Sequence, residues 1–177
     1  MALCGYTRSM KVKTRAIAYG LAVCLFTQTT VGGPLEDATA AADRGDFATA
    51  LRLIKPLADQ GDAKAQFHLG TMYENGQSVP QDYGASVKWY RKAADQGDAA
   101  AQSNLGLMYG AGKGVPRNFV LAYMWCNLAS ASYSADETKM RDHAVEFRNA
   151  IATKMTPDQI ALAQRLAREW ITAHLKK

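Results

Sequence analysis

The segment AKAQFHLGTMYENGQSVP (63–80) recurs 36 positions later as AAAQSNLGLMYGAGKGVP (99–116). The same five letters, ADQGD, precede both copies, at 58–62 and 94–98. Self-similarity at a fixed period of this length is typical of proteins built from stacked structural repeats. The repeat therefore predicts the fold more strongly than any single residue does.

Each copy contains two helical patterns. The first covers about 63–74 and again 99–110, and the second covers about 47–58, 83–95 and 119–131. A residue whose side-chain oxygen can accept from the backbone N–H groups of the first turn precedes every pattern: these residues are Asp46, Asp62, Asp82, Asp98 and Asn118. Glycine and proline interrupt the chain in the linkers 75–81 and 111–117.

These signals predict an all-α protein whose helix pairs stack into a superhelical α/α repeat. Within 34–132 we place a half repeat at 46–57 and two full repeats at about 58–93 and 94–131. A stack of this kind exposes an extended surface that can bind other macromolecules.

The tail, residues 133–177, does not repeat. Ser134 and Glu137 have the spacing of a capping box, and apolar residues from Met140 to Met155 follow at helical spacing. Thr156-Pro157-Asp158-Gln159 has the sequence of a second helix start. We therefore predict two C-terminal helices that cap the stack and cover the uncharged helix over 119–131.

The first 33 residues differ in kind from the rest. They hold four basic residues, no acidic residue and an apolar run over 16–26, which is typical of a secretory signal peptide. We predict a signal peptide over 1–33, with Met10 as a second candidate start, and a periplasmic or secreted bacterial protein. The alternatives are an inner-membrane anchor over 16–31 and, more weakly, a lipoprotein site at Cys24; membrane association is expected only if the segment is retained.

Charge and cysteine content exclude some functions for the rest of the chain. The whole chain carries a net charge of +5, but residues 34–177 hold 17 of its 21 basic residues and all 16 acidic ones. Nucleic-acid binding then lacks its main electrostatic support. Cys126 is the one cysteine in this part, so no disulfide can form within it; its twin is Tyr90, which favours a buried small hydrophobe over a reactive thiol.

The chain shows no motif of a catalytic or metal site. His-Glu-x-x-His, Cys-x-x-Cys and Gly-x-Ser-x-Gly do not occur, and the three histidines are isolated in the sequence. The recurring aspartates are explained as helix caps. We therefore expect a protein that is not an enzyme and has no cofactor and no metal.

The pattern Ala-x-Ala-Gln-x-x-Leu-Gly-x-Met-Tyr-x-x-Gly-x-x-Val-Pro, carried by 63–80 and 99–116, resembles the Sel1-like repeat, a relative of the tetratricopeptide repeat. The resemblance covers about 46–131. It implies an α/α solenoid that serves as an adaptor or scaffold for a protein or peptide partner. It also implies that bacterial members are often exported. An envelope hydrolase or a penicillin- or glycan-binding protein is the alternative, although the chain lacks the paired cysteines of the family members linked to penicillin binding.

The resemblance also indicates a binding face. Positions that differ between twins on the first helix of each repeat have no common packing role, and their spacing places them on one side of the helix. In tetratricopeptide-like stacks this side lines the concave groove. The predicted binding residues are Lys64, Phe67, His68, Thr71, Glu74, Asn75, Ser103, Asn104 and Leu107. We rank Phe67 first, because an aromatic side chain without a packing role suggests a contact. A further hypothesis is self-association through the leading half repeat.

Overall fold

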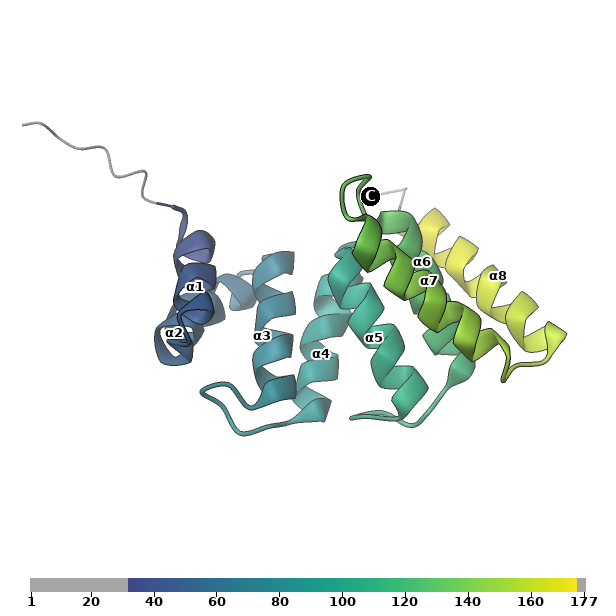
Figure 1. The fold of residues 1–177 in the computed structure, drawn as a ribbon, viewed down its shortest axis with the longest axis horizontal. Coiled ribbons are helices and arrows are strands. Elements are labelled where there is room, and N and C mark those ends of the chain that lie inside the picture. The colour runs from purple at the N-terminus through teal and green to yellow at the C-terminus, as the bar shows by residue number, and fades with distance from the viewer. Residues whose placement is uncertain (1–31, 175–177) are drawn as a thin grey trace, which may run out of the picture. The chain divides into compact units, whose positions relative to one another are not determined.

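The computed structural model describes residues 32–174, which form eight α-helices and no strand (Figure 1). Residues 1–31 of the predicted signal peptide lie outside this range. The helices are α1 (Pro34–Asp43), α2 (Phe47–Asp59), α3 (Ala63–Asn75), α4 (Tyr83–Ala94), α5 (Ala99–Ala111), α6 (Phe119–Ser132), α7 (Thr138–Ala152) and α8 (Pro157–His174). The predicted all-α repeat architecture is confirmed.

The five predicted helix caps are all present. In each, the side-chain oxygen accepts a hydrogen bond from the backbone N–H three residues later, at 2.7 Å for Asp62, 2.8 Å for Asp98 and 2.9 Å for Asp82. Asn118 and Asp46 make the same bond at 3.0 and 3.1 Å. Because these caps satisfy N–H groups that have no partner within the helix, they fix where the five helices begin.

Each helix packs against the next from α1 to α7. Two glycines allow the helices to approach closely: Gly70 faces the ring of Tyr90, and Gly106 faces Cys126 and the backbone of α6. The repeated glutamines stabilise the alternate junctions: Gln66 of α3 donates to the carbonyl of Ala58 in α2, and Gln102 of α5 donates to that of Ala94 in α4. These residues recur because equivalent junctions of the two repeats use the same contacts.

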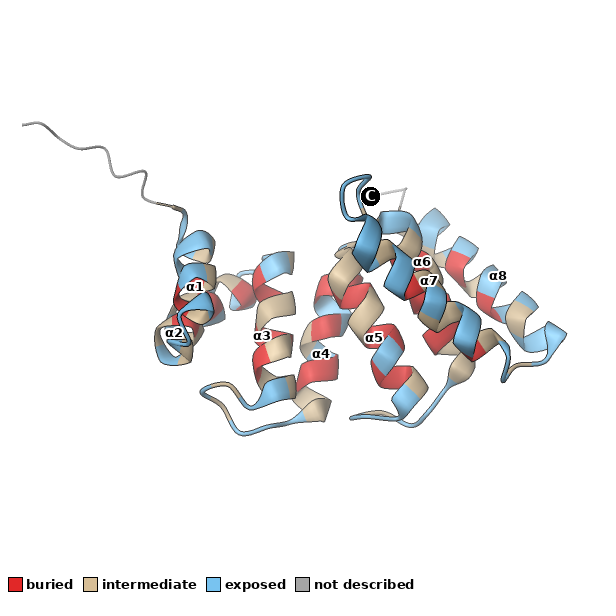
Figure 2. Ribbon diagram, in the orientation of Figure 1, coloured by how far each residue is buried: buried red, intermediate tan, exposed pale blue. Residues whose placement is uncertain are grey.

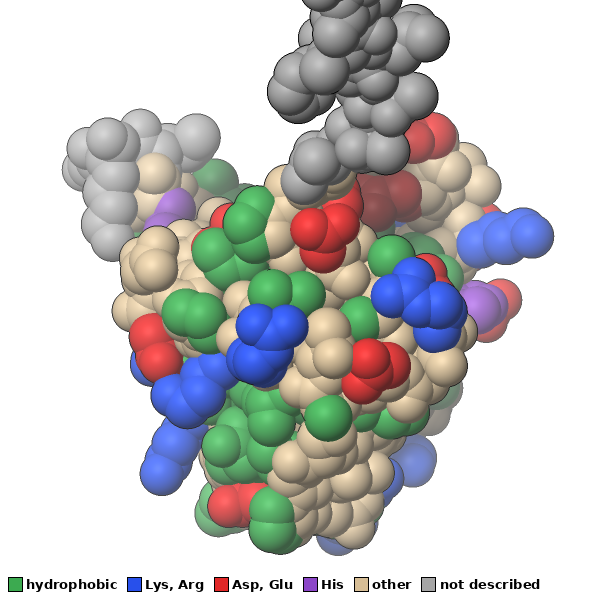
Figure 3. Space-filling model, turned by 90° about the vertical axis from the view of Figure 1, so that its left-hand side faces the viewer, with side chains coloured by type: hydrophobic (Ala, Val, Ile, Leu, Met, Phe, Trp, Pro, Cys, Tyr) green, Lys and Arg blue, Asp and Glu red, His purple; other side chains and the backbone are tan. Residues whose placement is uncertain are grey.

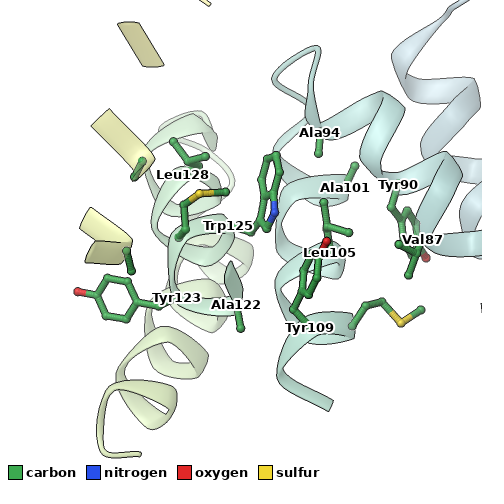
Figure 4. Packing of buried hydrophobic residues seen from close by; sticks show 14 of the residues in the cluster. Val87, Tyr90, Ala94, Ala101, Leu105, Tyr109, Ala122, Tyr123, Trp125 and Leu128 are labelled. Atoms are coloured by element: carbon green, nitrogen blue, oxygen red, sulfur yellow. The ribbon is translucent and has the colours of Figure 1, made fainter. Parts of the chain in front are cut away.

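Each of the eight helices contributes buried residues (Figure 2), and the buried side chains form two clusters. One cluster belongs to α1, α2 and α3, with Ile54 and Leu69 among its largest members. The other belongs to α4 through α8, and Figure 4 shows Trp125 of α6 projecting toward α5 within it. The core is thus a series of helix–helix contacts, as expected for a solenoid.

The tail helices do not pair with each other in the way a repeat does. Both α7 and α8 pack on α6, and the ring of Trp170 in α8 meets that of Trp125 edge-on at 6.0 Å. This explains why α6 lacks the charged residues of its twin α4. Thr156 and Gln159 form the predicted capping box, with bonds of 3.0 and 3.3 Å.

The predicted start of α7 is wrong. Ser134 donates through its N–H and hydroxyl to the Glu137 carboxylate, at 3.0 and 2.6 Å, so its oxygen does not cap a helix. Residues 134–137 form a turn instead, and α7 begins at Thr138. Met140, which was expected on the buried side of the helix, is 55% exposed because it lies in this displaced first turn.

Helix α1 was not predicted. It packs on α2, so the leading half repeat at 46–57 has a helical partner. Figure 3 looks onto the end of the stack that lies on the left of Figure 1, where apolar, basic and acidic side chains are interspersed. The end of the stack is therefore not a continuous apolar surface, and self-association through it stays a prediction.

Replacement of Ser78 by glycine should stabilise the protein by about 0.5 kcal/mol. Ser78 has a φ of 58°, whereas its twin Gly114 has a φ of 69°. A left-handed residue with a side chain costs about 1–2 kcal/mol, which exceeds the extra chain entropy of glycine, about 0.5–1 kcal/mol. Urea unfolding of S78G and wild type measures the difference; a loss of stability would contradict the left-handed conformation.

Candidate functional site

The predicted binding residues lie along α3 and α5, the first helices of the two repeats. Their exposure differs along these helices. Lys64, Asn75 and Leu107 are exposed, while Phe67, His68, Thr71, Glu74, Ser103 and Asn104 are partly buried. The predicted face therefore contains both exposed and partly buried side chains, and these must be described separately.

A buried tyrosine holds two of them in place. The hydroxyl of Tyr90 donates to the Glu74 carboxylate at 2.7 Å and lies 3.1 Å from the hydroxyl of Thr71. Burial raises the pKa of Tyr90 well above its ordinary value, so the hydroxyl remains a donor. Comparison of twins could not identify this residue, because its counterpart is Cys126, which has no hydroxyl.

Phe67 has a packing role, contrary to the premise on which it was ranked first. It is partly buried against the core, and its ring lies 5.9 Å from that of Tyr90. Its twin is Ser103, and the twin of Tyr90 is Cys126, so the second repeat has neither ring of this aromatic contact. A partner contact by Phe67 stays a prediction, but a Phe67 variant would alter the core as well as the face.

His68 lies in a cavity of about 280 Å³ between α3 and the first two helices, together with Asp43 and Thr71. Burial lowers the pKa of His68, so the imidazole is neutral at pH 7. Within residues 32–174, no hydrogen bond joins His68 to Asp43 or to Thr71. The geometry does not form a nucleophile–base pair and gives the hydrolase alternative no support.

A second cavity, of about 360 Å³, brings Glu74 and Leu107 together. Its apolar walls come from Leu107 and Met108 of α5, Phe119 of α6, and Phe147 and Ile151 of α7. Leu107 is 42% exposed, so its apolar side chain is accessible beside these walls. This cavity is therefore a candidate site that includes two residues of the predicted face.

Helix α7 forms one wall of this cavity because α5 makes room for it. A Cβ atom at Gly110 would lie 2.9 Å from Cζ of Phe147 and 3.4 Å from Cδ1 of Ile151. Gly110 is the twin of Glu74, so this difference between the copies marks a contact with α7. Comparison of the two copies shows that this position differs between them. It could not identify α7 as the neighbour of Gly110, since α7 has no twin.

Two lysines stand at the edge of the cavity. Nζ of Lys113 lies 5.2 Å from the ring centre of Tyr83, and Nζ of Lys154 lies 5.8 Å from that of Phe119. Gly114 packs against the backbone of Tyr83 and so holds the linker, with Lys113, at this edge. Within residues 32–174 neither lysine forms an ion pair, and Glu74 is the one carboxylate that lines the cavity.

Cys126 should not react with thiol reagents while the protein is folded. The side chain is fully buried, and burial raises the pKa of the thiol to about 12. The thiolate is the reactive form, and at neutral pH it is almost absent here. In a variant with Cys4 and Cys24 replaced by serine, Ellman's reagent should therefore label Cys126 only in denaturant, and rapid labelling of the native protein would contradict the packing of α5 on α6.

The repeat residues that build this face match a known family. Residues 63–98 and 99–133 each match the Sel1 repeat. The chain contains two Sel1 repeats. Sel1 repeats commonly form scaffolds for protein–protein interaction. None of the curated proteins is significantly similar to the whole chain.

Two solved structures share this architecture. One is c5321, a protective antigen of uropathogenic Escherichia coli strains with an SLR fold, which is 34% identical over 77% of this chain and superimposes with a TM-score of 0.66. The other is a Sel1 repeat protein from Oxalobacter formigenes, 32% identical over 60% of this chain, with a TM-score of 0.54. This chain spans 30% and 44% of their lengths.

No group of His, Cys, Asp and Glu side chains between residues 32 and 174 is arranged to hold a metal ion. In the same stretch, every helix is too short or too polar to span a bilayer.

Proposed function

We propose that this Sel1 repeat protein is an exported, non-enzymatic adaptor that binds a protein or peptide partner. The binding surface is the face of α3 and α5 together with the cavity closed by α7. The observation that carries the proposal is the exposed Leu107 beside the apolar walls of that cavity. Exposed apolar surface next to a well-formed cavity is typical of interaction sites.

Export is proposed from the sequence of residues 1–33, in which basic residues precede an apolar run. One structural relative is a protective antigen, which accords with this placement. We therefore propose that the protein acts in the periplasm or in the extracellular medium.

A matched pair of leucine variants tests the binding surface. Leu107→Glu should reduce partner capture strongly, because a buried, unpaired carboxylate is costly in an interface. Leu162→Glu in α8 is the control, since Leu162 is 36% exposed and lies away from the cavity. Both variants should unfold at nearly the wild-type temperature.

The measurement is affinity purification of each tagged protein from the periplasmic fraction, with quantification of co-purifying proteins. Equal recovery of partners by the two variants would rule out the proposed surface. Retention of residues 1–33 in the purified protein, shown by its intact mass, would argue for a membrane anchor instead.

A further inference from the structure

We infer that the cavity between α5 and α7 binds the C-terminal residue of a partner peptide, a large apolar residue whose free carboxylate lies between Lys113 and Lys154. This inference rests on the proposed function and specifies the chemistry of the partner. It joins three features of the cavity: its size, its apolar walls and the charges at its edge.

The cavity suits one large apolar side chain. Its volume of about 360 Å³ is near the lower end of ligand pockets, about 300–1,000 Å³. The walls are aromatic and aliphatic, from Leu107, Phe119, Phe147 and Ile151. Phe147 and Ile151 pack tightly against Gly110, so this wall exists before a ligand arrives.

The charges at the edge favour an anionic group. Lys113 and Lys154 contribute two ammonium groups, and both contact aromatic rings without a carboxylate partner within residues 32–174. Among the described residues that line the cavity, Glu74 is the one carboxylate, so the two ammonium groups outnumber it, and the Tyr90 hydroxyl donates a hydrogen bond to it. The edge therefore has an excess of positive charge, and an ammonium–carboxylate hydrogen bond is stronger than a neutral one.

A peptide C-terminus combines both requirements on one residue. An internal Asp or Glu brings a carboxylate without an apolar side chain, and an internal apolar residue brings no charge. A fatty acid also has both parts. However, the cavity includes Glu74 and Leu107 and therefore lies on the face of α3 and α5. The residues that precede the C-terminus of a peptide can continue along this face, whereas a fatty acid has no such extension.

Labelled hexapeptides with a Gly-Ser spacer test the inference in fluorescence anisotropy with the full chain. A peptide that ends in Phe with a free carboxylate should bind at least about tenfold more tightly than its C-terminal amide, a difference of about 1.4 kcal/mol. A peptide that ends in Ala should bind more weakly by a similar factor. Lys113→Gln combined with Lys154→Gln should abolish the preference for acid over amide.

Lys139→Gln, near the other end of α7, is the control and should leave the preference unchanged. Equal binding of acid and amide would overturn the carboxylate recognition. Tighter binding of palmitate than of the Phe peptide would identify a lipid-like occupant and overturn the peptide. If no peptide binds while Leu107→Glu still reduces partner capture, this inference fails and the proposed function stands; if Leu107→Glu has no effect on capture, the proposed function fails.

Discussion

Replacement of Trp125 by alanine should lower the free energy of unfolding by about 3–5 kcal/mol, the range for large-to-small changes at a buried aromatic. The side chain is 4% exposed and lies where α5, α6 and α8 meet. The substitution removes the edge-on contact with Trp170 and leaves a void in the larger core cluster. Urea unfolding followed by circular dichroism measures the loss.

Trp89→Ala is the internal control, because Trp89 occupies the same position in the preceding repeat. It is partly buried, and Lys92 covers its ring with Nζ at 3.8 Å from the ring centre. Within residues 32–174 neither tail helix packs extensively on α4, so we expect a loss of only about 1–2 kcal/mol from partial burial. Equal losses in the two variants would contradict the placement of α8 on α6.

Gly106→Ala should also destabilise the protein, although alanine is the better helix former. A Cβ atom at this position would overlap Sγ of Cys126 and lie 3.2 Å from the carbonyl oxygen of Ala122. Overpacking costs about 1–3 kcal/mol, and the backbone contact places this site at the upper end, above the gain of about 1 kcal/mol in helix propensity. We expect a net loss of about 2 kcal/mol by urea unfolding.

A double-mutant cycle with Cys126→Ala separates the two contacts. Removal of the sulfur should recover part of the loss caused by Gly106→Ala, because the side-chain overlap is relieved while the backbone contact remains. Additive losses would show that Cys126 is not the obstacle. The cycle also tests the explanation of why glycine recurs at positions 70 and 106.

The repeat made most of the fold predictable. The repeat period, the helix caps and the linker residues recur together, and each has the same physical role in both repeats. Helix α1 was missed although Ala42-Asp43-Arg44-Gly45-Asp46 repeats, with one change, the sequence that ends α2 and α4. That signal was present, but the helix before it has no similar twin.

The site was predictable only in part. Comparison of twins identified the face of α3 and α5, and it included Glu74 and Leu107, which line the cavity. It could not predict the wall formed by Phe147 and Ile151, because α7 occurs once. Nor could it separate positions that vary through packing, such as Phe67 and Gly110, from positions that vary because they face solvent.

The division of the buried side chains into two clusters has a consequence for local unfolding. Repeat proteins open in cooperative segments whose stability depends on neighbouring contacts. Helices α1, α2 and α3 share one buried cluster. Most of the apolar residues that line the α5–α7 cavity belong to the other cluster or pack against it. Unfolding that begins at α1 can thus extend toward α3 while the apolar part of the cavity stays folded. The stability of the N-terminal helices should therefore have little effect on the affinity for a ligand.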